Sequence, residues 1–251
     1  MTSPETRVVR CSFDDITVKQ PDISIEGHID FSDAWREDVT RLDIYNLTKE
    51  TESVIANSGS VIIEAGYEGR EAVLREGPVV EVEGIDNIGS RLTRVYVGTG
   101  LLDAVDTPFS KLYSTPTSSA KIIQDAVGEV EILAVGSISE TIRYEKKCYE
   151  TNVAEVVQSV VRDINGRAYI RDFSVIVDAG DTITETTELR TGKVSRSKLP
   201  RETTEVWRIE TPLNGSVAES VAVVLDGITY RVIEGTHDLS AWITKVECVQ
   251  I

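Results

Sequence analysis

Two stretches decide the fold of this chain: Asp43-Ile44-Tyr45-Asn46-Leu47 and Val61-Ile62-Ile63-Glu64-Ala65-Gly66-Tyr67-Glu68-Gly69. Each carries β-branched or aromatic residues and then ends in residues typical of turns. Residues 47–55, between the two stretches, fit one short helix capped by Thr48. The pattern predicts a strand, a helical connection and a second strand, with a valine-rich strand at 79–82 after Leu74 and Gly77.

Short strands fill the rest of the first hundred residues. They are expected at 7–13, 16–18, 23–29 and 92–98, and glycine, Asp and Asn residues separate them. The clearest alternation places Ile23, Ile25 and Ile29 on one face. Regular short strands of this kind are typical of a sandwich or barrel.

The middle of the chain changes to helical spacing. A helix is predicted at 120–127, after the cap and turn residues 115–119. A second helix, capped by Asn152, has one apolar face made of Val153, Val156, Val157, Val160, Val161 and Ile164. Residues 168–177 follow as a hairpin that turns near Arg171-Asp172. Residues 178–204 are polar and are expected to form a long exposed connection.

Strands resume in the last block, at 205–209, 221–225, 228–233 and 241–249, with Asp226-Gly227 as a two-residue hairpin turn. The predicted fold class is therefore mainly β with a small α+β insert. We expect a first barrel-like domain at 1–112, the insert at 113–189 and a second barrel-like domain at 190–251. Trp207 and Trp242 are expected in or beside the core. Trp35 is either a surface anchor or closes one end of the first barrel.

The charge of the chain limits its partners. The formal net charge is −16 over 251 residues, and the sequence pI is about 4.6. Such a surface repels phosphate backbones, so nucleic-acid binding is not expected. The acidic residues are dispersed and only nine of the 26 basic residues are lysines, a balance found in proteins of salt-loving microbes. The alternative is an ordinary acidic surface that keeps the protein soluble.

The high-salt interpretation makes a prediction about stability. Because the negative charges repel one another, the thermal midpoint should rise between 0.1 M and 1 M salt, where the Debye length falls from about 10 Å to about 3 Å. Melting curves at the two concentrations measure this. An unchanged or lower midpoint at 1 M would leave the ordinary acidic surface as the explanation.

Candidate catalytic or metal-binding residues are sparse. His28 and His237 form no H-x-H or H-E-x-x-H pattern, and the chain has no G-x-S-x-G sequence. The three cysteines, Cys11, Cys148 and Cys248, are far apart and are expected to be buried free thiols. Acidic pairs such as Glu145/Glu150 are either acid/base sites or solvated surface, and surface is favoured. The basic cluster at 193–201 is expected to be a solvated loop or a rim contact for an acidic subunit. We therefore expect no enzyme activity, metal or cofactor.

Targeting signals are also lacking. No apolar run approaches the ~20 residues that a membrane helix needs. Residues 1–7 lack the charged and then apolar layout of a signal peptide. The expectation is a soluble protein made in the cytosol, with no membrane partner.

The order of the motifs resembles that of tail hub proteins of tailed viruses, which join a tail tube to its tip. The first block resembles the opening barrel of that family, and the last block resembles its final barrel, with a Leu-Asn step, a tight turn, a Tyr-x-Val strand and a closing Trp strand. The middle helix and hairpin resemble the small insert of the family. The resemblance lies in the order of these motifs along the chain. The positions that carry the resemblance are Tyr45, Asn46, Leu47, Gly66, Tyr67, Gly69, Gly77, Leu213, Asn214, Tyr230 and Trp242.

The resemblance implies a structural role in the virion tail. Such hubs form homotrimers in which each chain supplies two related barrels, so that six barrels face a sixfold tube or distal tail ring and a threefold face meets a tip or spike protein. This chain departs from the family at residues 218–220, where Ala-Glu-Ser replaces a frequent Pro-Gly. The alternative function is a β-scaffold hydrolase or a polysaccharide-binding accessory domain.

Overall fold

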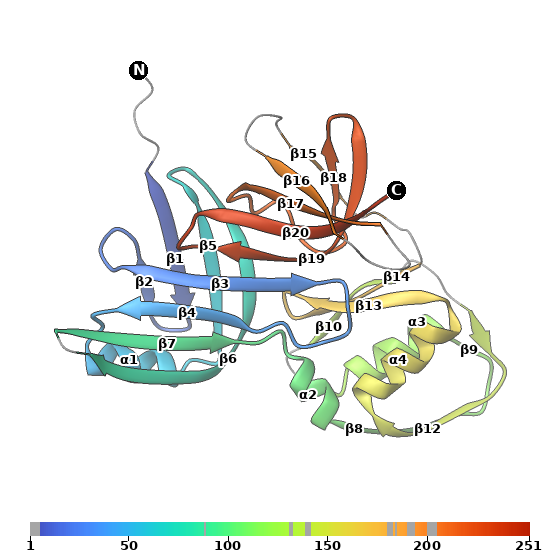
Figure 1. The fold of residues 1–251 in the computed structure, drawn as a ribbon. Coiled ribbons are helices and arrows are strands. Elements are labelled where there is room, and N and C mark those ends of the chain that lie inside the picture. Colours follow the sequence, from blue (N-terminus) through green and yellow to red (C-terminus); the bar gives the residue numbers. More distant parts are fainter. Residues whose placement is uncertain are drawn as a thin grey trace. The chain divides into compact units, whose positions relative to one another are not determined.

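A computed structural model describes residues 6–87, 89–130, 133–138, 142–179, 183, 185–189, 194–199 and 205–251. The chain forms two compact units (Figure 1). Unit 1 consists of Met1–Ser32, Asp38–Gly98 and Ile183–Ile251, and unit 2 consists of Asp33–Glu37 and Thr99–Thr182. The compact units change over at 98/99 and 182/183, while the three-domain division at residues 112 and 189 stays a prediction. The chain is mainly β with an α+β insert, as expected.

The described part of unit 1 forms one 13-stranded sheet with one short helix. Its strands are β1 (Arg7–Phe13), β2 (Thr17–Lys19), β3 (Ile25–Ser32), β4 (Thr40–Tyr45), β5 (Ser60–Tyr67), β6 (Arg70–Asn87), β7 (Ser90–Val97), β15 (Thr186–Glu188), β16 (Ser195–Leu199), β17 (Val206–Pro212), β18 (Ala222–Leu225), β19 (Ile228–Asp238) and β20 (Ile243–Gln250). The helix α1 (Lys49–Ala56) begins after Thr48, whose side chain accepts a hydrogen bond from the Thr51 amide, which confirms the predicted cap.

The strand order is β16-β17-β20-β19-β3-β4-β7-β6-β5-β1-β2, with β18 between β19 and β15. The pairing of β3 with β19, for example Ile29 with His237, joins the first and last blocks of the chain into one sheet. Among the described strands the order stays open at β16 and β2. The predicted barrels are therefore not closed, because the blocks meet edge to edge at β3 and β19 instead of each closing on itself.

A four-strand arrangement occurs twice in this sheet. The order β4-β7-β6-β5 in the first block matches β17-β20-β19-β18 in the last block, and all these pairs are antiparallel. In both, the second and third strands along the chain are joined by a two-residue turn that ends in a left-handed glycine, Gly69 (φ 77°) or Gly227 (φ 75°). In both, the third strand carries a bulge against the fourth, at Val79/Glu81 and at Val232/Glu234. In both arrangements the bulge bends the third strand.

Two apolar clusters form the core of unit 1. The larger one gathers buried residues of the first block with Leu213, Leu239 and Trp242 of the last block. The other cluster lies mainly in the last block, around Ile209, Tyr230 and Val246. Successive side chains of a strand point to opposite faces of the sheet, and this alternation selects the residues that face the core. In β3, for example, Ile25, Ile29 and Phe31 are buried while Glu26 is exposed.

The described residues of unit 2 form three helices and several short sheets. Its elements are α2 (Leu101–Asp106), β8 (Pro108–Tyr113), β9 (Thr117–Ser118), α3 (Ser119–Val127), β10 (Ala134–Ile138), β11 (Arg143–Tyr144), β12 (Lys147–Asn152), α4 (Val153–Asp163), β13 (Gly166–Arg171) and β14 (Ser174–Ala179). The predicted helices and the predicted hairpin are confirmed. Asn152 caps α4 by accepting from the Glu155 amide, and β13 pairs with β14 across a turn at Asp172-Phe173.

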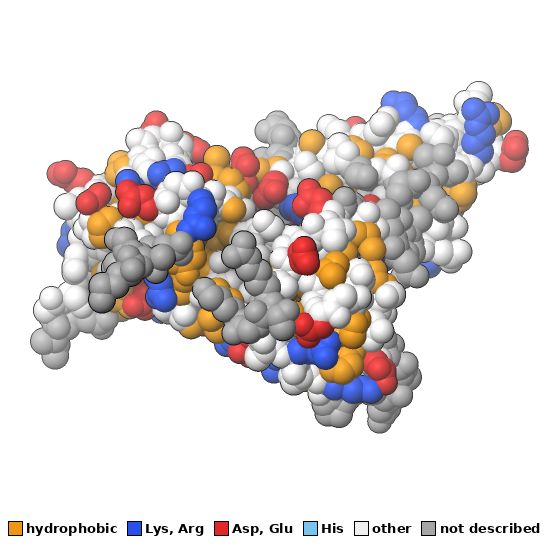
Figure 2. Space-filling view, turned by 90° about the horizontal axis from the view of Figure 1, so that it is seen from above, with side chains coloured by type: hydrophobic (Ala, Val, Ile, Leu, Met, Phe, Trp, Pro, Cys, Tyr) orange, Lys and Arg blue, Asp and Glu red, His pale blue; other side chains and the backbone are white. Residues whose placement is uncertain are grey.

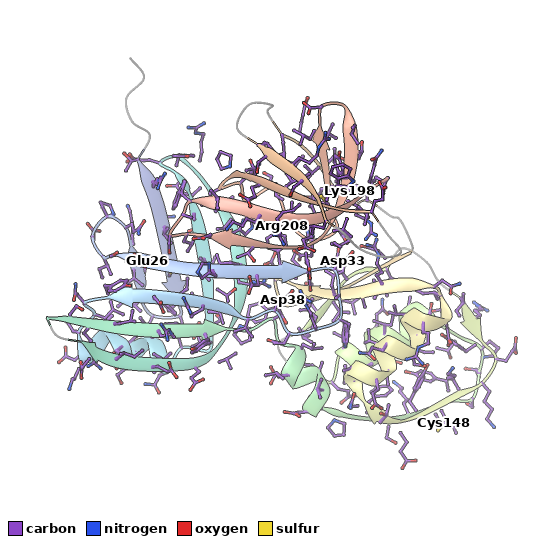
Figure 3. The ribbon with its side chains drawn as sticks, in the orientation of Figure 1. Glu26, Asp33, Asp38, Cys148, Lys198 and Arg208 are labelled. Atoms are coloured by element: carbon purple, nitrogen blue, oxygen red, sulfur yellow. The ribbon has the colours of Figure 1, made fainter. Side chains whose placement is uncertain are left out.

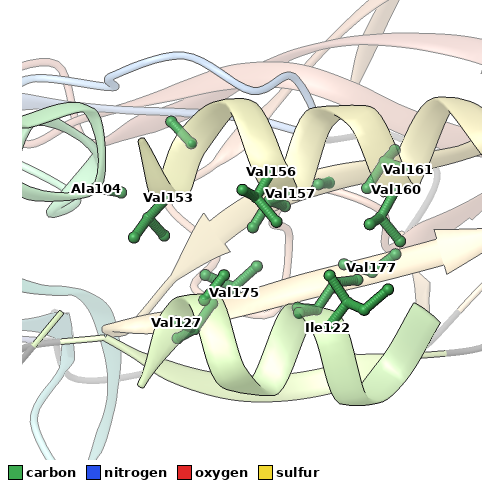
Figure 4. Packing of buried hydrophobic residues seen from close by; sticks show 14 of the residues in the cluster. Ala104, Ile122, Val127, Val153, Val156, Val157, Val160, Val161, Val175 and Val177 are labelled. Carbon is green, nitrogen blue, oxygen red and sulfur yellow. The ribbon is translucent and has the colours of Figure 1, made fainter. Parts of the chain in front are cut away.

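The core of unit 2 is built on the valine face of α4. Val153, Val156, Val157 and Val160 are fully buried. Figure 4 shows these side chains pointing toward Val175 and Val177 of β14 and toward α3. β-Branched residues lower helix propensity, but the packing of this apolar face outweighs that cost. In the described part of the chain, no helix is long and apolar enough to cross a membrane.

The polar connection expected at 178–204 is partly structured. It contains β15 and β16, which pair with β18 and β17. The prediction missed them because polar strands at a sheet edge lack the apolar alternation that marks a half-buried strand. The remainder of that stretch, at 180–182, 184, 190–193 and 200–204, lies outside the described residues.

Candidate assembly site

The first three motif positions end strand β4. Tyr45 is its last residue and donates a hydrogen bond to Glu26, at 3.4 Å. Asn46 is left-handed (φ 60°), and its amide donates to the Arg91 carbonyl oxygen at 2.7 Å. Leu47 is buried in the larger core of unit 1. This step stops the strand, turns the chain and fixes the start of α1.

The motif glycines lie where another side chain would strain or clash. Gly69 is left-handed in the turn that pairs Tyr67 with Arg70. A Cβ on Gly66 would lie 2.5 Å from the Arg70 carbonyl oxygen, and a Cβ on Gly77 would collide with the Gly98 carbonyl oxygen. These glycines allow the backbone to approach closely at both ends of the β5–β6 hairpin.

Four motif positions from distant parts of the chain come together. The rings of Tyr67 and Trp242 are in edge contact at 6.1 Å, and Arg7 lies over Trp242 at 5.3 Å. The Leu213 amide donates to the Trp242 carbonyl oxygen at 3.0 Å, and the Asn214 amide donates to the Thr244 hydroxyl at 3.1 Å. The cluster Tyr67, Leu213, Asn214 and Trp242 therefore ties the last block to the first.

Tyr230 is not part of that cluster. It is fully buried in the other core of unit 1, 6.2 Å from the Trp207 ring. Its hydroxyl accepts a 2.6 Å hydrogen bond from Arg196, whose guanidinium also lies over Trp207. The described part of the basic cluster thus contains a strand, β16, whose Arg196 guanidinium lies over the rings of Trp207 and Tyr230.

Neither histidine has a catalytic setting. His237 is buried, lies 4.8 Å from the Phe31 ring, and has Nδ1 2.9 Å from the Thr244 hydroxyl. Burial, with a contribution from the nearby Arg75 guanidinium, lowers the pKa of His237 to about 3. His28 lies 3.9 Å from Asp238. The described residues contain no group of three or more His, Cys, Asp or Glu side chains that could hold a metal ion.

The cysteines differ in part from the expectation. Cys11 and Cys248 are buried, and burial raises the pKa of both thiols to about 12, so they are inert. Cys148 is exposed instead (Figure 3). It lies opposite the exposed Leu112 on the β8–β12 ribbon.

Sequence reasoning missed Arg75. This β6 residue is only 4% exposed, and its Nη2 donates to the Asp30 carbonyl oxygen on β3. Asp30 in turn accepts from the Thr236 hydroxyl of β19 at 2.5 Å. In the sequence, Arg75 stands between Leu74 and Glu76, and a charged residue in a strand is normally a surface residue, so no local signal marks it as buried.

Charges on the surface are mixed in sign. Figure 2 shows acidic and basic side chains interspersed with apolar ones on the face in view. Several form ion pairs across strands, such as Arg94–Asp43 and Arg208–Glu247, each at 2.8 Å. Exposed pairs at a surface contribute about 0–1 kcal/mol each, whereas the Arg94–Asp43 pair is partly withdrawn from solvent because Asp43 is buried.

The arrangement of the motif positions is structural. They end strands, allow close backbone approach, or tie blocks together through buried contacts. Such positions set the shape of a β scaffold and hold its loops, which are the parts of such folds that meet partners.

Comparisons with known proteins agree with this description. No protein-family model matches the chain, and no curated protein matches it. Several solved structures are similar to this chain. The tail protein from Neisseria meningitidis MC58 has a TM-score of 0.67 at 9% identity, over 97% of this chain and 96% of that chain. The 43 kDa tail protein of prophage MuSo2 from Shewanella oneidensis has a TM-score of 0.68 at 8% identity, over 97% and 98%.

A third similar structure comes from a secretion machine. It is the E. coli c3393 protein, a component of the type VI secretion system with structural similarity to T4 bacteriophage tail proteins gp27 and gp5. Its TM-score is 0.66 at 7% identity, over 96% of this chain and 76% of that chain. At such low identities the likeness establishes the fold. Over nearly its whole length, this chain has the fold of phage and prophage tail proteins.

Proposed function

We propose that this chain is a structural tail hub protein of a tailed virus. Three copies would form a ring that adapts a sixfold tail tube to a threefold tail tip. The observation that carries the proposal is the repeated arrangement, β4-β7-β6-β5 and β17-β20-β19-β18, with a two-residue glycine turn and a third-strand bulge in each. The tail-protein fold supports the same role.

The repeated four-strand arrangement would resolve a mismatch between threefold and sixfold symmetry. A threefold ring that meets a sixfold tube leaves half of the tube subunits without equivalent contacts. Two related β blocks in each of three chains present six similar surfaces, so the closed ring can satisfy both symmetries. The loops between the repeated strands would carry the tube contacts.

The partners follow from this role. They are two further copies of the chain, the tail tube or a distal tail ring, and a tip or spike protein, all within the virion tail. The motif positions from Tyr45 to Trp242 would serve assembly indirectly, because they fix the ends of the strands that present the loops. The role requires no catalytic residue, cofactor or metal.

Copy number tests the proposal. A map of the assembled tail should contain three copies of this chain, with the two four-strand arrangements alternating about 60° apart around the ring. Light scattering on purified protein provides a second measurement, with a trimer expected. Six copies in the tail, or a stable dimer in solution, would contradict the hub role.

A further inference from the structure

The connection between β3 and β4 has an unusual course. Both strands belong to unit 1, yet most of the residues between them, Asp33–Glu37, belong to unit 2. We call this segment the strap. Figure 3 labels Asp33 and Asp38 at this connection. Elsewhere the chain passes between the units at 98/99 and 182/183.

The ends of the strap are pinned in unit 1. The Ser32 hydroxyl lies 3.1 Å and 3.0 Å from the two carboxylate oxygens of Asp38, to which it donates. Ser32 is 2% exposed and Asp38 is 5% exposed. Within the strap, the Arg36 amide donates to the Ala34 carbonyl oxygen at 2.9 Å, so the chain turns tightly. The segment is therefore a loop whose two ends are held together by the buried Ser32–Asp38 hydrogen bond. We call this pair of residues the neck.

Three strap residues anchor it in unit 2. Asp33 pairs with Arg167 of β13 at 2.5 Å. Trp35 packs against the core cluster of unit 2, so it is neither a free surface anchor nor a barrel plug. Glu37 accepts hydrogen bonds from the Thr99 amide at 2.7 Å, from the Thr99 hydroxyl at 3.0 Å and from the Leu101 amide at 3.0 Å.

Glu37 takes the place of a helix cap. α2 begins after Gly100, which offers no side chain, so the Glu37 carboxylate satisfies amides at the start of this helix. Among the described residues, Nε and Nη2 of Arg167 are buried without a hydrogen-bond partner, while its Nη1 pairs with the Asp33 carboxylate. An unpaired buried charge is costly, so loss of the strap would loosen β13 as well.

We propose that the strap is a conformational device that couples the opening of the neck in unit 1 to the opening of α2 and β13 in unit 2. When the neck at Ser32 and Asp38 opens, the anchors at Asp33, Trp35 and Glu37 are withdrawn, and both α2 and β13 open more often. The coupling is reciprocal, as every thermodynamic coupling is. A change in β3, which pairs with β19 across the two blocks, thereby reaches the insert.

Hydrogen exchange on the full chain, followed by mass spectrometry of peptides, tests the coupling. Ser32→Ala removes the hydroxyl of the neck, whose hydrogen-bond partner Asp38 belongs to unit 1. Exchange in peptides covering α2 and β13 should rise about tenfold, the ratio expected for loss of one buried hydrogen bond to a charged group. The control is Ser60→Ala, which removes an exposed Ser–Asp hydrogen bond of unit 1, to Asp14 at 3.0 Å, and should leave α2 and β13 unchanged.

A second variant keeps the test decisive if Ser32→Ala unfolds unit 1. Glu37→Gln weakens the anchor at α2, and reciprocity requires faster exchange in β3 and β4 as well as in α2. If Glu37→Gln affects α2 alone, Glu37 is a local helix cap and the coupling is refuted. The proposal is equally overturned if Ser32→Ala leaves α2 and β13 as protected as Ser60→Ala does.

Discussion

Val157→Asp should lower the free energy of unfolding of unit 2 by about 3 kcal/mol or more, enough to leave the insert largely unfolded. Val157 is fully buried in the core that α4 shares with Val175 and Val177 of β14. A carboxylate at that position would be buried in an apolar environment without a partner. The helix must then detach, or the core must admit water.

The matched control places the same new carboxylate one residue further along the helix. Gln158 is exposed, so Gln158→Asp should cost only the difference in helix propensity, within about 0.7 kcal/mol. Glu155→Gln, on the exposed face, should also be tolerated. Urea unfolding followed by near-ultraviolet circular dichroism measures all three. Equal losses at 157 and 158 would show that the valine face does not pack as described.

Gly77→Ala should destabilise unit 1 by about 3 kcal/mol, at the upper end of the usual cost of overpacking. The added Cβ would collide with the Gly98 carbonyl oxygen, which is a backbone atom and cannot rotate away. β6 would have to shift, which disturbs its pairing with β5 at Val61. Among the motif glycines, Gly77 leaves the least room for a Cβ, and it lies in β6, a strand paired on both sides.

Gly59→Ala provides the comparison for Gly77→Ala. A Cβ on Gly59 would have the Asp14 carboxylate oxygen at 3.5 Å as its nearest neighbour, which is ordinary van der Waals contact. Its stability should be unchanged or slightly higher, because alanine restricts the unfolded chain more than glycine does. Chemical denaturation midpoints of the two variants decide the matter. If Gly77→Ala is as well tolerated as Gly59→Ala, the close approach of β6 to Gly98 is wrong.

Local signals in the sequence were sufficient for several elements. Side-chain oxygens at Thr48 and Asn152 satisfy amides at the starts of α1 and α4, and the 3.6-residue spacing of valines in α4 matches one buried face. Asp226-Gly227 adopts the positive φ angles of a tight hairpin turn. Each of these features depends on residues within a few positions of one another, so a sequence pattern is enough to predict it.

Local sequence patterns could not predict that the two blocks join through β3 and β19. The pairing of β3 with β19 brings together residues about two hundred positions apart, and alternation in each strand says which face is buried but not which strand is its neighbour. The same limit applies to the cluster of Tyr67 and Trp242 and to the Arg75 contact with Asp30. The order of the motifs suggested the tail-protein fold through a resemblance, while the contacts that build it lie between distant segments.

By itself, the sequence determined the mainly β composition, the capped helices, the tight turns and the acidic charge, because each follows from neighbouring residues or from their total. Only the tertiary structure decided that the two blocks share one open sheet, that β15 and β16 lie in a polar connection, and that Asp33–Glu37 belongs to the insert. Edge strands and straps carry no apolar period. Their positions depend on the hydrogen bonds and ion pairs that distant partners offer once the chain has folded.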